Sequence, residues 1–197
     1  MTSPLSAEDF DDLHDFIKVQ VAVGYATIGE IVEEAVQVFV ADTTADANAL
    51  RGAALAVADR ALSAHVADQA NWPDTTDCDR LDTAFAELDR TGIVARQHFS
   101  CCGTCGAHEI HDEMDQAEKA GTPPRGYTFF HVQDTEHAVG GDLLYLSYGA
   151  VNRDKTASVA VGREVVAVLG LHGLSPAWNG KHAHRIALPL TWQRRRT

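Results

Sequence analysis

The sequence is poor in basic residues, with 16 Lys and Arg against 28 Asp and Glu and a formal net charge of −12. A surface this negative repels phosphate backbones and anionic membranes. We therefore expect no nucleic acid and no membrane among its partners, whereas a basic protein would suit such a surface. The one basic run, Arg194–Arg196, has the composition of a solvated chain end.

Long apolar runs are also missing. The most apolar stretch, 16–40, is interrupted by Lys18, Glu30, Glu33 and Glu34, whereas a membrane-spanning helix needs about 20 consecutive, predominantly apolar residues. The acidic N-terminus has no basic segment followed by an apolar one, as a secretory signal would. We expect a cytoplasmic protein, and in that reducing compartment clustered cysteines more often indicate metal or redox chemistry than structural disulfides.

The common catalytic signatures are absent as well. The sequence contains no Gly-x-Ser-x-Gly, no P-loop, no dinucleotide-binding fingerprint and no His-Glu-x-x-His. These motifs identify serine hydrolases, nucleotide-binding proteins, dehydrogenases and zinc proteases. None of these enzyme classes is therefore indicated.

What is present first is a helical N-terminal region. Ser6 is placed to cap one helix, Thr27 with Glu30 has the form of a capping box for a second, and an alanine-rich third helix is expected over 47–70. The segment 71–74, Asn-Trp-Pro-Asp, breaks this pattern. We predict a helical region over residues 1–72 and a second domain over residues 73–197.

The second domain has an α+β pattern. A short helix capped by Thr76 or Asp77 precedes strands predicted at 93–99, 127–132, 143–148 and 184–192, with helices over 107–119 and near 161–173. A further helical turn is expected at 133–139. The order of the main elements, β-α-β-β-α-β, is that of the ferredoxin-like split βαβ arrangement, an antiparallel sheet with both helices on one face. The last strand is expected at the sheet edge, where Pro189 is tolerated.

Three of the four cysteines lie within five residues, at 101, 102 and 105. Cys102-x2-Cys105 has the spacing of half a structural zinc site, and a complete site needs four ligands. His108 and His111 on the following helix are weaker candidates, because an ordinary solvated helix face explains them better than a ligand pair does.

Cys78 is the other candidate for a fourth ligand. Its helix covers about 18 Å and the next strand about 23 Å, which would return the chain to the level of Cys78 where Cys101 begins. We therefore expect a zinc site, structural in role, built from Cys78, Cys105 and one or both of Cys101 and Cys102. A small buried hydrophobic residue is an equally good interpretation of Cys78.

Two other functions fit the same residues. Cys105 lies near a predicted helix N-terminus, where backbone N–H groups lower a thiol pKa, so Cys102 and Cys105 are candidate catalytic thiols with Cys102 as the resolving partner. Alternatively, the domain is a non-catalytic binding or regulatory module, since ferredoxin-like sheets often present one open face to a partner.

The chain resembles a mainly actinobacterial family that is described as a domain of unknown function. The resemblance rests on the block from Arg96 to Cys102 with Cys105-Gly106, and on later blocks that begin at Gly126, Ser147 and Trp178. It covers roughly 72–195 and implies the domain without implying an activity. Similar proteins carry histidine directly after the glycine, where this chain has Ala107 and then His108, so the resemblance favours the three clustered cysteines over His108.

Overall fold

The computed structural model describes residues 5–41, 43 and 46–196, and it divides into two compact units. Unit 1 comprises Met1–Asp74 together with Gln193–Thr197, and unit 2 comprises Thr75–Trp192. The last five residues, which the sequence analysis assigned to the second domain, thus group with the N-terminal helices.

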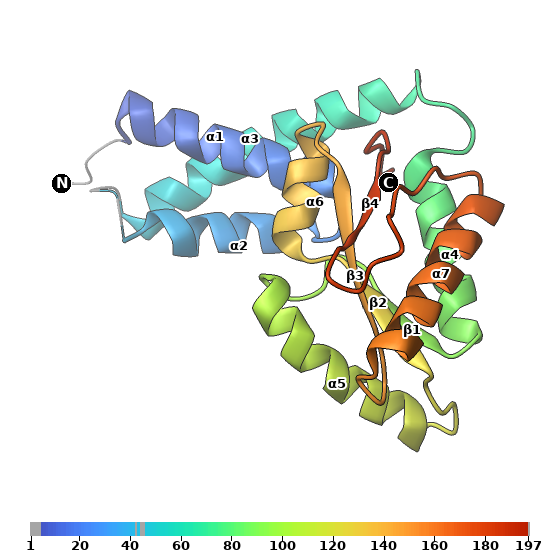
Figure 1. The fold of residues 1–197 in the computed structure, drawn as a ribbon. Helices are drawn as coiled ribbons and strands as arrows, with labels where there is room; N and C mark the ends of the chain where they lie inside the picture. Colours follow the sequence, from blue (N-terminus) through green and yellow to red (C-terminus); the bar gives the residue numbers. More distant parts are fainter. Residues whose placement is uncertain (1–4, 42, 44–45, 197) are drawn as a thin grey trace. The chain divides into compact units, whose positions relative to one another are not determined.

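Unit 1 contains the three predicted helices, α1 (Ala7–Val23), α2 (Ile28–Phe39) and α3 (Ala47–Gln69) (Figure 1). Ser6 and Thr27 each accept a hydrogen bond from the backbone three residues later, and the acidic side chain there returns one, so both predicted caps are confirmed. Asp46 caps α3 in a similar way. These caps satisfy N–H groups that the first helical turn leaves unpaired.

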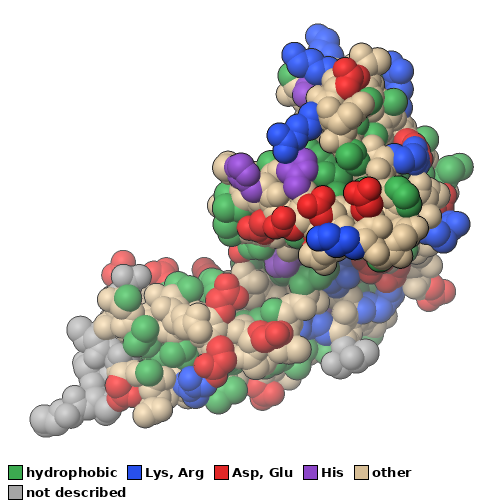
Figure 2. Space-filling model, turned by 90° about the horizontal axis from the view of Figure 1, so that it is seen from below, with side chains coloured by type: hydrophobic (Ala, Val, Ile, Leu, Met, Phe, Trp, Pro, Cys, Tyr) green, Lys and Arg blue, Asp and Glu red, His purple; other side chains and the backbone are tan. Residues whose placement is uncertain are grey.

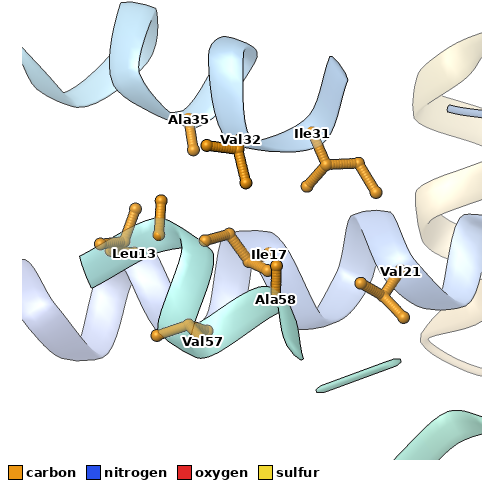
Figure 3. Close-up of a cluster of buried hydrophobic side chains, with 9 residues drawn as sticks. Leu13, Ile17, Val21, Ile31, Val32, Ala35, Val57 and Ala58 are labelled. Carbon is orange, nitrogen blue, oxygen red and sulfur yellow. The ribbon is translucent and has the colours of Figure 1, made fainter. Parts of the chain in front are cut away.

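The core of unit 1 is an apolar cluster to which all three helices contribute. Figure 3 shows the side chains of α1, α2 and α3 pointing toward one another. The buried members are Leu13, Ile17, Val21, Ile31, Val32, Ala35, Ala54, Val57 and Ala58. Burying each of the larger side chains stabilises the unit by about 1.5–3 kcal/mol.

Arg196 ties the C-terminal segment to the end of α1. Its guanidinium donates to the carbonyl oxygens of Gln20 (3.1 Å), Val21 (2.7 Å) and Ala26 (2.9 Å). Its main chain also exchanges two hydrogen bonds with the amide of Gln69 on α3. The last carbonyls of a helix lack partners within it and attract a cation, so this arginine completes unit 1 instead of lying in solvent.

Unit 2 is built on a four-stranded mixed sheet with the strand order β1-β2-β3-β4. The strands are β1 (Ile93–Arg96), β2 (Gly126–Phe129), β3 (Leu144–Ala150) and β4 (Ile186–Leu188). β1 and β2 are parallel, with Ile93 opposite Gly126, whereas β2 with β3 and β3 with β4 are antiparallel. β4 lies at an edge, as predicted, and Pro189 follows it directly.

Helices cover both faces of this sheet. α4 (Asp77–Arg90) and α7 (Lys155–Leu171) lie together on one face, and α5 (Gly103–Lys119) lies on the other (Figure 1). Successive side chains of β2 point to opposite faces of the sheet. Phe129 packs against α5 on one face, and Gly126 leaves room for Val161 of α7 on the other. The short α6 (Val132–Val139) packs beside β3.

The mixed α+β class is confirmed, but the ferredoxin-like arrangement is not. The predicted sheet was antiparallel with both helices on one face, whereas β1 and β2 are parallel neighbours and helices cover both faces. The 17-residue α5 provides a helical crossover that either arrangement could use, and the direct hydrogen bonding of β1 to β2 is what decides between them. No strand is inserted between β1 and β2, as a split βαβ unit would require.

Acidic side chains are spread over the face that Figure 2 shows and lie among apolar and basic ones, in keeping with the net charge of −12. Within the described residues, none of the helices combines the length and the apolar character that crossing a bilayer demands.

Candidate metal centre

The three clustered cysteines lie together at the start of α5. One potential ligand atom from each of Cys101, Cys102 and Cys105, the Sγ, lies within 4.8 Å of the other two. Cys101 is exposed and the other two are partly exposed, and all three are reduced. The site is therefore open to an ion or a reagent from solvent.

The helix begins four residues earlier than predicted, and this determines the role of each cysteine. α5 starts at Gly103, so Cys102 is its N-cap and Cys105 lies within its first turn. The backbone N–H groups of Cys105 and Thr104 lower the pKa of the Cys102 thiol, assisted by the Cys105 side chain. Hydrogen bonding to Cys101 and Cys102 raises the pKa of Cys105 to about 11.

This assignment reverses the one expected from sequence. Cys105 was predicted to have the lowered pKa, whereas the structure gives that property to Cys102, because the N-cap position faces the unpaired amides of the first turn. Cys105, with its raised pKa, is the thiol that keeps its proton longer of the two. A thiolate at Cys102 lies where the positive end of the α5 dipole stabilises it.

The loop before the cysteines is held in a strained conformation. His98 and Ser100 have φ values of 51° and 62°, in the left-handed region that residues other than glycine rarely adopt. Each such residue costs about 1–3 kcal/mol, which the surrounding structure must offset. The Nδ1 of His98 lies 2.9 Å from the hydroxyl of Thr135 and contributes to that support. The hydroxyl of Ser100 is buried and has no hydrogen-bond partner among the described residues.

The parallel pairing of β1 and β2 brings a second loop to the cysteines. The N–H of Phe99 donates to Phe130 (2.8 Å), and the N–H of Val132 donates to Ser100 (3.1 Å). Parallel strands deliver their carboxyl ends to the same sheet edge, so the loops after β1 and β2 meet there. A Cβ at Gly103 would lie 3.5 Å from the imidazole of His131, which places this buried histidine beside the start of α5.

Gly106 fixes the distance between α5 and the sheet. A Cβ at this position would lie 2.6 Å from the ring of Phe129, which is 1% exposed. Only glycine therefore allows this close approach of the first helical turn to β2. Because Gly106 directly follows Cys105, the contact also fixes where the cysteines lie.

A family model for a domain of unknown function, DUF6891, matches residues 6–196. The chain belongs to the DUF6891 family. The resemblance to a domain-of-unknown-function family is thereby confirmed, and the match extends over the N-terminal helices as well. Comparison with curated proteins and with solved structures gives no match.

The structure does not bring all the predicted ligands together. Cys78 is buried near the start of α4 and does not join the three other cysteines. The side chain of Gln97, just beyond β1, donates to Asp82 of α4 (2.9 Å), one helical turn past Cys78. The comparison of helix and strand lengths therefore predicted the level of the chain after β1 to within about one turn of α4. However, α4 and α5 cover opposite faces of the sheet, and α5 carries the cluster away from Cys78.

The two histidines also lie outside the cluster. His108 is exposed on α5. His111 stacks edge-on against Tyr127 of β2, and its Nε2 lies 3.0 Å from the guanidinium of Arg153. Neither joins the group of three sulfurs in this DUF6891 structure.

A polar network beside the cluster was not predicted. Asp134, which is 4% exposed, accepts from both terminal nitrogens of Arg185 and lies 3.0 Å from the Nε2 of His131. The Nδ1 of His131 accepts from the N–H of Asp134, as a helix cap does. Burial lowers the pKa of His131 and so favours the neutral ring, whose Nδ1 can accept this hydrogen bond. The spacing of His131 and Asp134 could have predicted the helix cap. The pairing of Asp134 with Arg185 could not have been predicted from local sequence, because the two residues are 51 positions apart.

Proposed function

We propose that Cys101, Cys102 and Cys105 bind a metal ion, and that the ion is zinc. The observation that carries the proposal is the convergence of three sulfur atoms within 4.8 Å of one another. In a tetrahedral zinc site with Zn–S bonds of about 2.3 Å, the sulfurs lie about 3.8 Å apart. Displacements of about an ångström would therefore suffice to surround an ion.

The electrostatics of the helix start support the same proposal. Metal ligands are thiolates, so a site must favour loss of protons from its thiols. The lowered pKa of Cys102 provides the first thiolate, and the ion would displace the proton held by Cys105. The dipole of the 17-residue α5 stabilises the negative charge of three thiolates around one divalent ion.

Three protein ligands leave a fourth coordination position. Structural zinc sites are closed by four protein ligands, whereas catalytic sites keep one position for water or substrate. Because Cys78, His108 and His111 lie outside the cluster, the geometry favours an open position over the purely structural role expected from sequence. The exposure of Cys101 gives this position access to solvent.

Metal titration of cysteine variants tests the proposal. The reduced, metal-free chain should take up about one equivalent of Zn²⁺, and Co²⁺ should produce the absorption of tetrahedral thiolate coordination. The Cys105→Ser variant should lose this binding. Cys78→Ala is the matched control and should retain it. Uptake below about a tenth of an equivalent by the native sequence would refute the proposal.

A second candidate function, thiol–disulfide exchange, is favoured by the contrast between Cys102 and Cys105. Cys102, with its lowered pKa, beside Cys105, with a pKa raised to about 11, has the arrangement of an attacking and a resolving cysteine. The Cys102 thiolate would attack a disulfide of a partner, and a neighbouring thiol would then release it. Reduction of a small disulfide substrate by the native chain and not by Cys102→Ser would support this alternative.

A further inference from the structure

We infer that a groove between α1 and α3 in unit 1 binds a small amphipathic anion, specifically a carboxylate with a short aliphatic chain. The groove has a volume of about 350 Å³, which is at the lower end of the range for small-molecule sites. All of its lining residues come from α1 and α3, so it belongs to unit 1 alone.

The charge of the groove is opposite to that of the chain. Lys18 and Arg60 line it, and Asp68 is the one acidic residue among the described residues that do so. Its formal charge is therefore +1 with histidines neutral, in a chain whose net charge is −12. Where the structure describes the chain, neither Lys18 nor Arg60 forms an ion pair with a carboxylate. Among the described residues, two cations of an acidic protein thus have no carboxylate partner.

Two histidines extend the same surface. His14 lies one helical turn before Lys18 on α1, and its Nδ1 is 3.2 Å from Asp15. The Nε2 of His65 on α3 lies 2.9 Å from the carbonyl oxygen of Arg194 and donates to it, which fixes the orientation of the ring. His65 therefore provides a rigid polar wall, while Lys18 and Arg60 provide the charge.

Small apolar side chains create the hollow. Ala22 on α1 with Ala61 and Ala64 on α3 line the groove, and larger side chains at these positions would occupy its volume. Their methyl groups, with the side chain of Val21, form the apolar part of its lining, which is the floor of the groove. An aliphatic chain loses water-exposed surface on such a floor while its carboxylate meets Lys18 and Arg60, so the groove is complementary to an anion with an apolar tail.

Octanoate is a suitable probe. Octanol and acetate distinguish the contribution of its charge from that of its aliphatic chain. The full-length, isotope-labelled chain should show amide shifts in α1 and α3 on titration with octanoate, and much smaller shifts with octanol, which lacks the charge, or acetate, which lacks the chain. The double variant Lys18→Gln/Arg60→Gln should bind octanoate about tenfold more weakly, because each exposed charge contributes up to about 1 kcal/mol. Ala64→Leu should abolish binding by filling the floor, with the charge unchanged.

Arg90→Gln is the matched control, because it removes an exposed arginine of α4 and should leave octanoate binding unchanged. The four substituted side chains, those of Lys18, Arg60, Ala64 and Arg90, are all exposed. A thermal unfolding curve for each variant checks that it folds. Octanoate shifts no larger than those of octanol would overturn the inference. So would a double glutamine variant that binds octanoate within about twofold of the native chain.

Discussion

Replacing Gly106 by alanine should destabilise unit 2, although alanine is the better helix former. The new Cβ would lie 2.6 Å and 2.9 Å from two ring atoms of Phe129, distances at which atoms must move apart. Phe129 has little room to move, because it is 1% exposed and its ring packs against those of Phe99 and Tyr127. Either α5 shifts outward or the aromatic cluster rearranges.

The two opposing contributions can be compared. Alanine in place of glycine within a helix stabilises by about 0.5–1 kcal/mol, whereas an added methyl group in a filled core costs about 1–3 kcal/mol. We expect a net loss of about 1–2 kcal/mol for Gly106→Ala. Gly170 on α7 is the matched control, since a Cβ there meets no atom within 4 Å. Gly170→Ala should therefore stabilise by about 0.5–1 kcal/mol.

Thermal and urea unfolding show whether the free energy of unfolding falls in Gly106→Ala and rises in Gly170→Ala. A loss of about 1–2 kcal/mol corresponds to a decrease of about 2–8 °C in Tm for a chain of this size. Zinc affinity should also fall in Gly106→Ala, because the start of α5 carries the cysteines. If Gly106→Ala proved as stable as Gly170→Ala, the close contact between α5 and β2 would not exist in solution, and the reasoning would be refuted.

Three further predictions concern other parts of the chain. In the reduced, metal-free protein, iodoacetamide should modify Cys102 at lower pH than Cys105, because each thiol reacts as its thiolate. The rate of modification of Cys105 should rise only toward pH 11. Identical pH profiles for the two cysteines would contradict the lowered pKa of Cys102. Arg196→Ala should lower the free energy of unfolding of unit 1 by about 2 kcal/mol, since two carbonyls of α1 and that of Ala26 lose a charged donor. A loss below about 0.5 kcal/mol would show that water replaces the guanidinium. Asp134→Ala should cost unit 2 about 3 kcal/mol, because it leaves Arg185 without its buried partner, and an unchanged urea midpoint would argue against the pair.

The helices of unit 1 could be predicted because their signals are local. The caps at Ser6 and Thr27 depend on side chains three residues away, and the apolar faces repeat within each helix. The pairing of β1 with β2 could not be predicted in the same way. The order of elements is identical whether two strands are parallel neighbours or are separated by a third, and only contacts distant in sequence decide between these arrangements.

For the candidate site, too, the local features could be predicted from sequence and the long-range contacts could not. Proximity of Cys101, Cys102 and Cys105 follows from their spacing, whereas the early start of α5 does not, because glycines at 103 and 106 disfavour a helix. The helix forms there because Gly106 fits against Phe129, a tertiary contact. The exclusion of Cys78 likewise depends on which face of the sheet each helix covers.

The grouping of Gln193–Thr197 with the N-terminal helices has a consequence for synthesis on the ribosome. Residues 1–74 emerge first, yet the arginine that caps α1 is translated only after all of unit 2. Unit 2 is contiguous and can fold as it emerges, while unit 1 waits for a segment more than a hundred residues downstream. A released chain that ends at residue 192 should therefore contain a folded second unit and a helical first unit that proteases cut more readily than in the full chain.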